Sequence, residues 1–221
     1  ETRSAIVDGN LQFGDVSVFI NEQRKNTVLD LATISDESDP EIVGNVMIKH
    51  KDSGVHILAA PSRPEQAETV SGRDFSQILQ YLRRLYAYVI IDTPSFLTDV
   101  VLSSIEESDI VVLLATQEIP AIKNTRLFLD LISSLALERE RIVFVMNRYD
   151  KCIGITPEKV SENYKVDVAT TIPSDEIIVI PSVNRGIPFM LGNKTQPASR
   201  GILSLAEKVR ERIIVLETED E

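Results

Sequence analysis

The sequence has little of what marks secreted, membrane-spanning or nucleic-acid-binding proteins. It contains one cysteine, Cys152, so no disulfide framework can form, and this fits a reducing cytoplasm. No apolar run approaches the roughly 20 residues of a membrane-spanning helix, and no secretory signal opens the chain. Lys and Arg number 23 against 34 Asp and Glu, a net charge of −11 that argues against nucleic-acid binding. We therefore expect a cytoplasmic protein without nucleic-acid partners.

A phosphate-binding loop is also missing. The pattern G-x-x-x-x-G-K-[ST] occurs nowhere in the 221 residues. Gly9 and Gly14 are five residues apart in IVDGNLQFGDV, but Asp15 stands where Lys is needed and Val16 where Ser or Thr should stand. Because an acidic side chain would repel a phosphate, this stretch is not the loop itself.

What the sequence does contain is an alternation of β-branched runs and helical periods. Helical spacing of apolar residues predicts helices over Ser71–Tyr86, Ile122–Leu135 and Ser204–Leu216. Predicted strands cover Ser4–Asp8, Val55–Ala59, Tyr88–Asp92, Ile110–Thr116, Arg141–Asn147 and Val168–Ile172. Two of them hold continuous apolar runs, which are typical of strands buried on both faces. We predict an α/β fold in one domain over residues 1–216, a doubly wound, mostly parallel sheet flanked by helices, with an acidic tail over 217–221.

Polar residues and a proline stand where four of these strands end. In an open parallel sheet, ligands bind beyond the carboxyl ends of the strands. Asp92 follows four apolar residues, as in a Walker B strand whose carboxylate reaches magnesium, although Asp is also a common turn residue. Asp8 ends another strand. Asn147 could pair its amide with a purine edge, and Pro173 could cover a base or simply start a turn.

Taken together, these segments resemble the MinD/ParA family of deviant-Walker P-loop ATPases over nearly the whole chain. The matching stretches are VDGNLQFGDVSVF, TVLDLAT, VHILAAPSRPEQAE, YVIIDTPSFLTDVVLSSIEESDIVVLLATQEIPAIKNTR, FVMNRYD and IPSDEIIVIPSVNRGIPFML. The first of them is most similar to the pilus-assembly ATPases of the TadZ/CpaE type. In that family the phosphate loop lies upstream of the strand that holds Asp8, and the GNLQFGD stretch corresponds to switch I.

The resemblance implies ATP and Mg as cofactors and assigns roles to the strand ends. Asp8 would lie near magnesium and the γ-phosphate, and Asn10 stands where many relatives carry the Asp that positions the attacking water. Asp92 would be the Walker B carboxylate at the metal. A further set would bind the adenine side of the nucleotide: Asn147, Arg148, Pro173 and Asp175. Without the loop lysine and hydroxyl, the 221 residues alone are not expected to hydrolyse ATP.

Several functions remain open at this point. The resemblance favours an ATP-dependent dimerising switch that positions a pilus or secretion machine in bacteria, including at a cell pole, with a homodimer formed through the nucleotide face near Gln117–Arg126. A non-catalytic scaffold with the same fold is the alternative. A ParA-like partition ATPase would need a basic surface, which −11 does not favour. A MinD-like membrane reader would need a basic C-terminal helix, whereas this terminus is acidic, so no strong direct membrane binding is expected.

Overall fold

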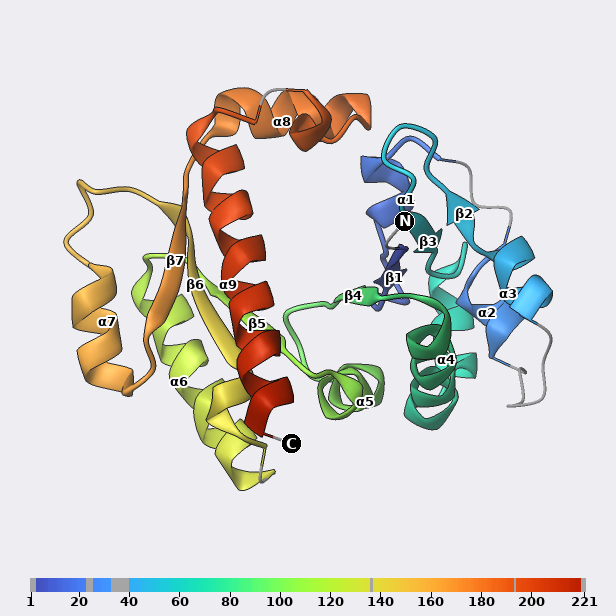
Figure 1. The fold of residues 1–221 in the computed structure, drawn as a ribbon, viewed down its shortest axis with the longest axis horizontal. Coiled ribbons are helices and arrows are strands. Elements are labelled where there is room, and N and C mark those ends of the chain that lie inside the picture. Colours follow the sequence, from blue (N-terminus) through green and yellow to red (C-terminus); the bar gives the residue numbers. More distant parts are fainter. Residues whose placement is uncertain (1–2, 23–25, 33–39, 136, 193, 220–221) are drawn as a thin grey trace. The chain divides into compact units, whose positions relative to one another are not determined.

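The chain divides into two compact units that are described one at a time. The computed structural model describes residues 3–22, 26–32, 40–135, 137–192 and 194–219. Residues 1–107 and 180–191 form unit 1, and residues 108–179 and 192–221 form unit 2. Figure 1 shows the elements of both units with their labels.

Unit 1 is a four-stranded sheet with helices packed against it. Its strand order is β2-β3-β1-β4, in which β1 pairs in parallel with β3 and β4, and β2 pairs antiparallel to β3. The strands are β1 (Ser4–Asp8), β2 (Ile48–Lys49), β3 (His56–Leu58) and β4 (Tyr88–Asp92). The helices are α1 (Val16–Phe19), α2 (Val28–Leu31), α3 (Pro40–Val46), α4 (Gly72–Leu85) and α5 (Asp99–Glu107).

Helix α4 covers one face of this sheet because its apolar residues recur at helical spacing. Phe75, Leu79 and Leu82 are buried in one cluster with Ala5 and Val7 of β1. The helix begins with a capping box, in which Ser71 accepts from the amide of Asp74 and the Asp74 carboxylate accepts from the amide of Ser71. Helix α5 lies beside α4 (Figure 1).

Unit 2 is a three-stranded parallel sheet in the order β5-β6-β7. Its elements are β5 (Val111–Ala115), α6 (Ile119–Ser134), β6 (Ile142–Tyr149), α7 (Pro157–Tyr164), β7 (Val168–Pro173) and α9 (Pro197–Glu219). Phe144 and Met146 of β6 pack with Val160 of α7. Helix α9 runs along β7 and β6, with a hydrogen bond between Thr170 and Ser204 (Figure 1). The remaining helix, α8 (Glu176–Arg185), starts in unit 2 and ends in unit 1.

The predicted elements are present, and most of them have shifted ends. Strands Ser4–Asp8 and Tyr88–Asp92 are confirmed to the residue. Helix α9 starts at Pro197, seven residues before the predicted start, because proline is well tolerated in the first turn. It also continues to Glu219, so the first three residues of the expected tail are helical, and residues 220–221 lie outside the described residues. Among the described residues, no helix is both long and apolar enough to cross a membrane.

The expectation that the apolar strands are buried on both faces is wrong for two of them. Along β4, Val89 and Ile91 pack on the core, whereas Ile90 points to the other face and is 58% exposed. Along β5, Leu113 packs on the core, whereas Leu114 is 52% exposed. The physical reason is that helices cover one face of each strand, and no described helix of the same unit covers the other face at these positions. Each strand also ends its sheet, so one of its backbone edges pairs with no described strand.

Candidate functional site

The two predicted acidic residues of unit 1 lie next to each other at the carboxyl ends of paired strands. Asp8 ends β1 and Asp92 ends β4, and they are register partners in the parallel ladder. The amide of Gly9 donates to the carbonyl of Asp92 at 2.7 Å, which joins the two strand ends just beyond the sheet. A Cβ on Gly9 would lie 2.9 Å from that carbonyl oxygen, so glycine allows the close approach.

Asp8 holds the loop that follows it. Its carboxylate is fully buried and accepts from the amides of Asn10 at 3.3 Å and Val16 at 3.2 Å. Gly14 lies against the same carboxylate. Asn10 closes the loop from inside, because its side chain donates to the carbonyl of Phe13 at 3.0 Å and accepts from the Phe13 amide at 3.4 Å. The loop from residue 9 to 15 is thus shaped by two of the predicted site residues.

Asp92 has the electrostatic surroundings of a cation-binding carboxylate. Its side chain is exposed at the strand end, yet neighbouring protein atoms desolvate it enough to raise the pKa of Asp92, and the Asp15 carboxylate raises it further. A divalent cation would relieve that repulsion, so Asp92 fits a metal-side role. Among the described residues, no group of three or more His, Cys, Asp and Glu could hold a metal ion. Magnesium commonly uses one or two carboxylates with water and phosphate oxygens, so Asp92 fits such a site but does not complete it.

The predicted base-side residues gather at the carboxyl ends of β6 and β7 in unit 2. Asn147 is the register partner of Ile172, and Tyr149 that of Pro173. Between Asn147 and Tyr149 the register shifts at Arg148, which has a φ of 51°, in the left-handed region. This bulge separates Arg148 from the ladder and leaves its side chain exposed.

Hydrogen bonds hold these two strand ends in place, one within β6 and one from the residue after β7 to β6. The Asn147 side-chain oxygen accepts from the Arg148 amide at 2.9 Å. The Ser174 amide donates to the carbonyl of Tyr149 at 3.2 Å. Beyond this turn the carbonyl of Asp175 accepts from the amides of Ile178 and Val179 and so starts α8.

A residue that the sequence did not single out as a ligand-side group braces this region. Gln117, just after β5, is 6% exposed and bonds the two ends of the loop Asp150–Ile155 that follows β6. Its partners are 33 and 38 residues away along the chain, so no local pattern could have revealed them.

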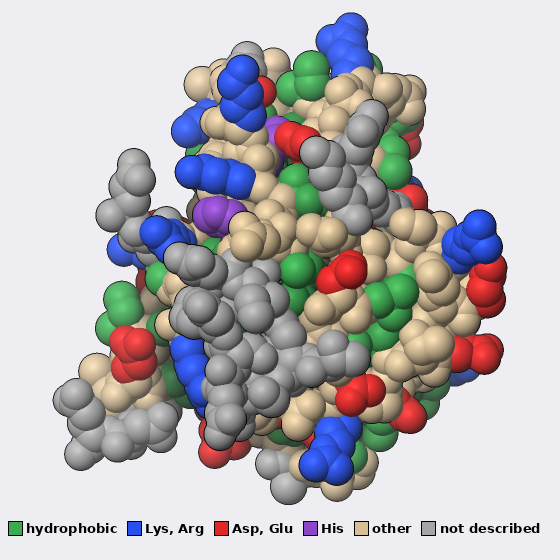
Figure 2. Space-filling model, turned by 90° about the vertical axis from the view of Figure 1, so that its right-hand side faces the viewer, with side chains coloured by type: hydrophobic (Ala, Val, Ile, Leu, Met, Phe, Trp, Pro, Cys, Tyr) green, Lys and Arg blue, Asp and Glu red, His purple; other side chains and the backbone are tan. Residues whose placement is uncertain are grey.

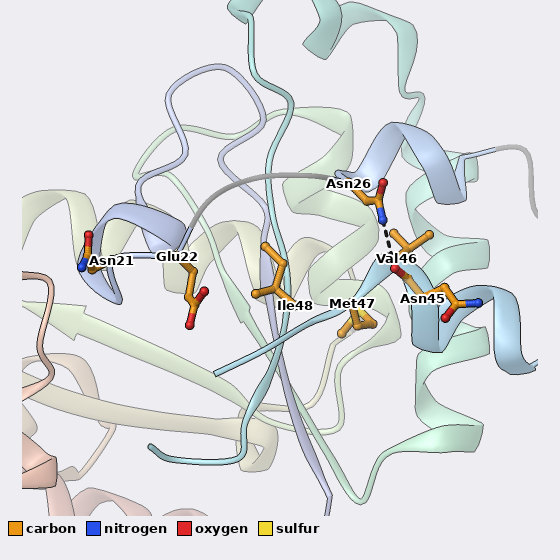
Figure 3. A pocket seen from close by; sticks show the side chains of 7 residues that line it. All are labelled: Asn21, Glu22, Asn26, Asn45, Val46, Met47 and Ile48. Carbon is orange, nitrogen blue, oxygen red and sulfur yellow. Dashed lines mark hydrogen bonds between the residues drawn. The ribbon is translucent and has the colours of Figure 1, made fainter. Parts of the chain in front are cut away.

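A cavity of about 380 Å³ in unit 1 contains none of the predicted site residues. It is lined by Asn21, Glu22, Asn26, Asn45, Val46, Met47 and Ile48. Figure 3 shows Asn26 turned toward Asn45, whose backbone oxygen accepts from the Asn26 side chain at 2.9 Å. We assign no ligand to this cavity.

The sequence and the structure were compared with those of known proteins. No protein-family model matches the chain. The septum site-determining protein MinD of Thermotoga maritima is 21% identical over 219 residues, which cover 97% of this chain and 79% of the relative. A ParA family ATPase from Chlorobium tepidum matches with a TM-score of 0.84 at 18% identity, covering 96% of this chain and 86% of that one.

A third match carries a nucleotide. The MinD protein of Pyrococcus horikoshii, solved in complex with Mg-ADP, matches with a TM-score of 0.78 at 23% identity, covering 94% of this chain and 83% of that one. These similarities establish that the chain has the α/β fold of ParA and MinD ATPases, a mostly parallel arrangement of strands flanked by helices, as the sequence predicted.

Proposed function

We propose that the chain is the greater part of a MinD/ParA-type ATPase that binds ATP with magnesium, dimerises on binding it, and positions a pilus or secretion assembly machine. The observation that carries the proposal is the register pairing of Asp8 with Asp92 at the carboxyl ends of β1 and β4. The likeness to a MinD structure with Mg-ADP supports the choice of nucleotide and metal. The pilus role rests on the similarity of VDGNLQFGDVSVF to the pilus-assembly ATPases of the TadZ/CpaE type.

The residues divide into two roles under this proposal. In unit 1, Asp92 holds the magnesium side, Asp8 shapes the loop facing the γ-phosphate, and Asn10 positions water. In unit 2, Asn147 and Arg148 with Pro173 and Asp175 hold the base. Bound magnesium would supply charge neutralisation for the phosphates, and the chain's own residues orient the nucleotide.

The phosphate loop would come from a strand–loop–helix unit that precedes Ser4 in the whole protein. Two features of unit 1 support this. The outer edge of β4 pairs with no described strand, and the side chains of Tyr88 and Ile90 on one face of β4 are exposed. A parallel strand beside β4 would pair that edge, and its following helix would cover Ile90. The coding sequence upstream of Glu1 tests this, because a strand followed by G-x-x-x-x-G-K-[ST] is expected there.

The decisive test of the function is magnesium-dependent ATP turnover by the full-length protein. Asp92→Ala should abolish it, because the metal-side carboxylate is removed. Asp52→Ala, which changes an exposed aspartate on a turn of the same unit, is the matched control and should leave turnover unchanged. Turnover that survives Asp92→Ala would refute the metal-side role. The 221 residues alone should release no phosphate above a buffer blank.

A non-catalytic scaffold is the second candidate, and one observation favours it. The loop after β1 is closed by its own side chains, since Asp8 is bonded to the amides of Asn10 and Val16 and Asn10 is bonded to Phe13. A full-length protein that binds ATP but never turns it over would support the scaffold.

A further inference from the structure

Gln117 in unit 2 makes two long-range hydrogen bonds with its side-chain amide. Its side chain is almost fully buried, and both ends of its amide are used. The oxygen accepts from the Asp150 amide at 2.6 Å, and the nitrogen donates to the carbonyl of Ile155 at 2.7 Å. A buried amide that loses a partner carries an unsatisfied polar group, so this pair of bonds fixes the side chain firmly.

Besides Gln117, the loop is held by short-range bonds, by a bond from the Lys159 ammonium to the carbonyl of Gly154 at 3.2 Å, and by packing of Ile155 on the core of unit 2. The Asp150 carboxylate accepts from the amide of Cys152 at 2.8 Å, and its carbonyl accepts from the amide of Ile153 at 3.1 Å. Both bonds close a tight turn, and neither ties the loop to the sheet. Gln117 ties the loop to the end of β5 by hydrogen bonds, one at each end of the loop.

This attachment lies directly beside the base-side residues. Asp150 follows Tyr149, whose carbonyl holds Ser174, and Tyr149 follows the bulged Arg148. A left-handed φ at a residue other than glycine costs backbone free energy and persists where its surroundings hold it. The anchor at Asp150 fixes the chain two residues after the bulge, and so maintains the orientation of Asn147 and the spacing to Pro173.

We propose that Gln117 is a positioning residue for base recognition, acting through the Asp150–Ile155 loop without touching the nucleotide. The inference deepens the proposed function and rests on it for the identity of the ligand. Loss of Gln117 would loosen the loop at Asp150 and weaken the contacts that Asn147 and Pro173 make with the base. Contacts with the phosphates, which the phosphate loop would make, would be retained.

The test compares two ligands on the full-length protein: Mg-ATP, which has a base, and magnesium tripolyphosphate, which has none. Gln117→Met keeps the unbranched shape and removes both hydrogen bonds. It should weaken ATP binding about tenfold, the effect of losing one to two net hydrogen bonds. Tripolyphosphate affinity should not change. Gln196→Met makes the same chemical change at a half-buried position elsewhere in unit 2 and should alter neither affinity.

Each other outcome has a defined meaning. Equal weakening of both ligands, or no weakening of ATP, would overturn the positioning role. Wild-type protein that binds ATP no more tightly than tripolyphosphate would instead refute base binding, and with it the proposed function. A measurement without nucleotide tests the positioning role independently of the proposed function. Hydrogen exchange of the Asp150 amide should be faster in Gln117→Met than in wild type. Unchanged exchange would show that Gln117 does not hold the loop.

Discussion

At the scale of single residues, Gly14 is the position where the loop after β1 has no room for a side chain. A Cβ there would lie 2.3 Å from a carboxylate oxygen of Asp8 and 2.4 Å from the Cβ of Ala60. Both neighbours are fully buried, so neither can move aside cheaply. Gly14 is thus needed for close packing around Asp8, and Gly9 for the close approach to the carbonyl of Asp92, which explains a spacing that resembles half of a phosphate loop.

Gly14→Ala should therefore lower the free energy of unfolding by about 1–3 kcal/mol, the usual cost of overpacking. Gly44→Ala is the control, because a Cβ at that exposed position in α3 meets nothing within 4 Å. It should raise stability by about 0.5–1 kcal/mol through helix propensity. Urea unfolding of the three proteins measures both effects, and equal midpoints for Gly14→Ala and wild type would contradict the packing argument.

Asn10→Asp tests the water-positioning role in the full-length protein. A carboxylate could accept a proton as well as orient water, so hydrolysis should rise several-fold with little change in ATP affinity. Phosphoryl transfer depends more on orientation than on proton removal, which keeps the expected gain modest. The variant also loses the bond from the Asn10 amide to Phe13. A single-turnover rate equal to wild type would identify Asn10 as a loop-closing residue.

The sequence predicted the strand-end residues but not what their side chains do. Asp8 and Asp92 were placed correctly, because an apolar run followed by Asp locates a strand end. The bonds from Asn10 to Phe13 follow from loop geometry that spacing alone does not determine. The role of Gln117 depends on contacts across more than 30 residues, which one sequence cannot reveal.

At the scale of elements, strand β3 has a histidine held in its neutral form. Burial lowers the pKa of His56, and the positive charges of Lys49 and Arg3 lower it further. Its Nδ1 is buried without a hydrogen-bond partner among the described residues, and its ring lies 5.4 Å from that of Tyr86. Figure 2 shows the side of the molecule that lies on the right in Figure 1, and histidine side chains lie there beside Lys and Arg side chains.

A lowered pKa in the folded state means that the unfolded chain binds the proton more readily. The contribution of neutral His56 to stability is therefore complete above about pH 6.5 and falls as the pH drops below it. His56→Gln should reduce the loss of melting temperature between pH 7.5 and 5.5 relative to wild type. Identical pH dependence in the two proteins, measured by thermal unfolding, would show that His56 does not titrate at a lowered pKa.

Helices were harder to predict than strands for a physical reason. Amphipathic spacing located α4, whose apolar stripe faces the sheet. Helix α8 has no fully buried residue and contains Pro181, so neither periodicity nor propensity marks it. The face of β4 at Ile90 was mispredicted because a continuous apolar run indicates that something covers both faces, without saying which element does so.

At the scale of the whole molecule, net charge bears on the roles that the proposed function leaves open. A net charge of −11 does not suit a protein that holds chromosomal DNA through a basic surface. Helix α9 packs along β7 and β6 inside unit 2. Under the proposed function, this charge favours a protein partner over DNA.

Nucleotide-dependent dimerisation is the prediction that separates the switch from the scaffold. The stretch Gln117–Arg126 was expected near the interface, and its first residue turns out to be used within unit 2, while Ile119 is exposed beside it. Sedimentation of the full-length protein should show a monomer without nucleotide and with ADP, and a dimer with ATP. Ile119→Glu should prevent the dimer while leaving ATP affinity unchanged, because it places a charge on that exposed surface. Leu203→Glu, at an exposed position on α9, should dimerise like wild type and serves as the control. A monomer under all three conditions would remove the switch and leave a scaffold, since binding that does not change the assembly cannot signal through it.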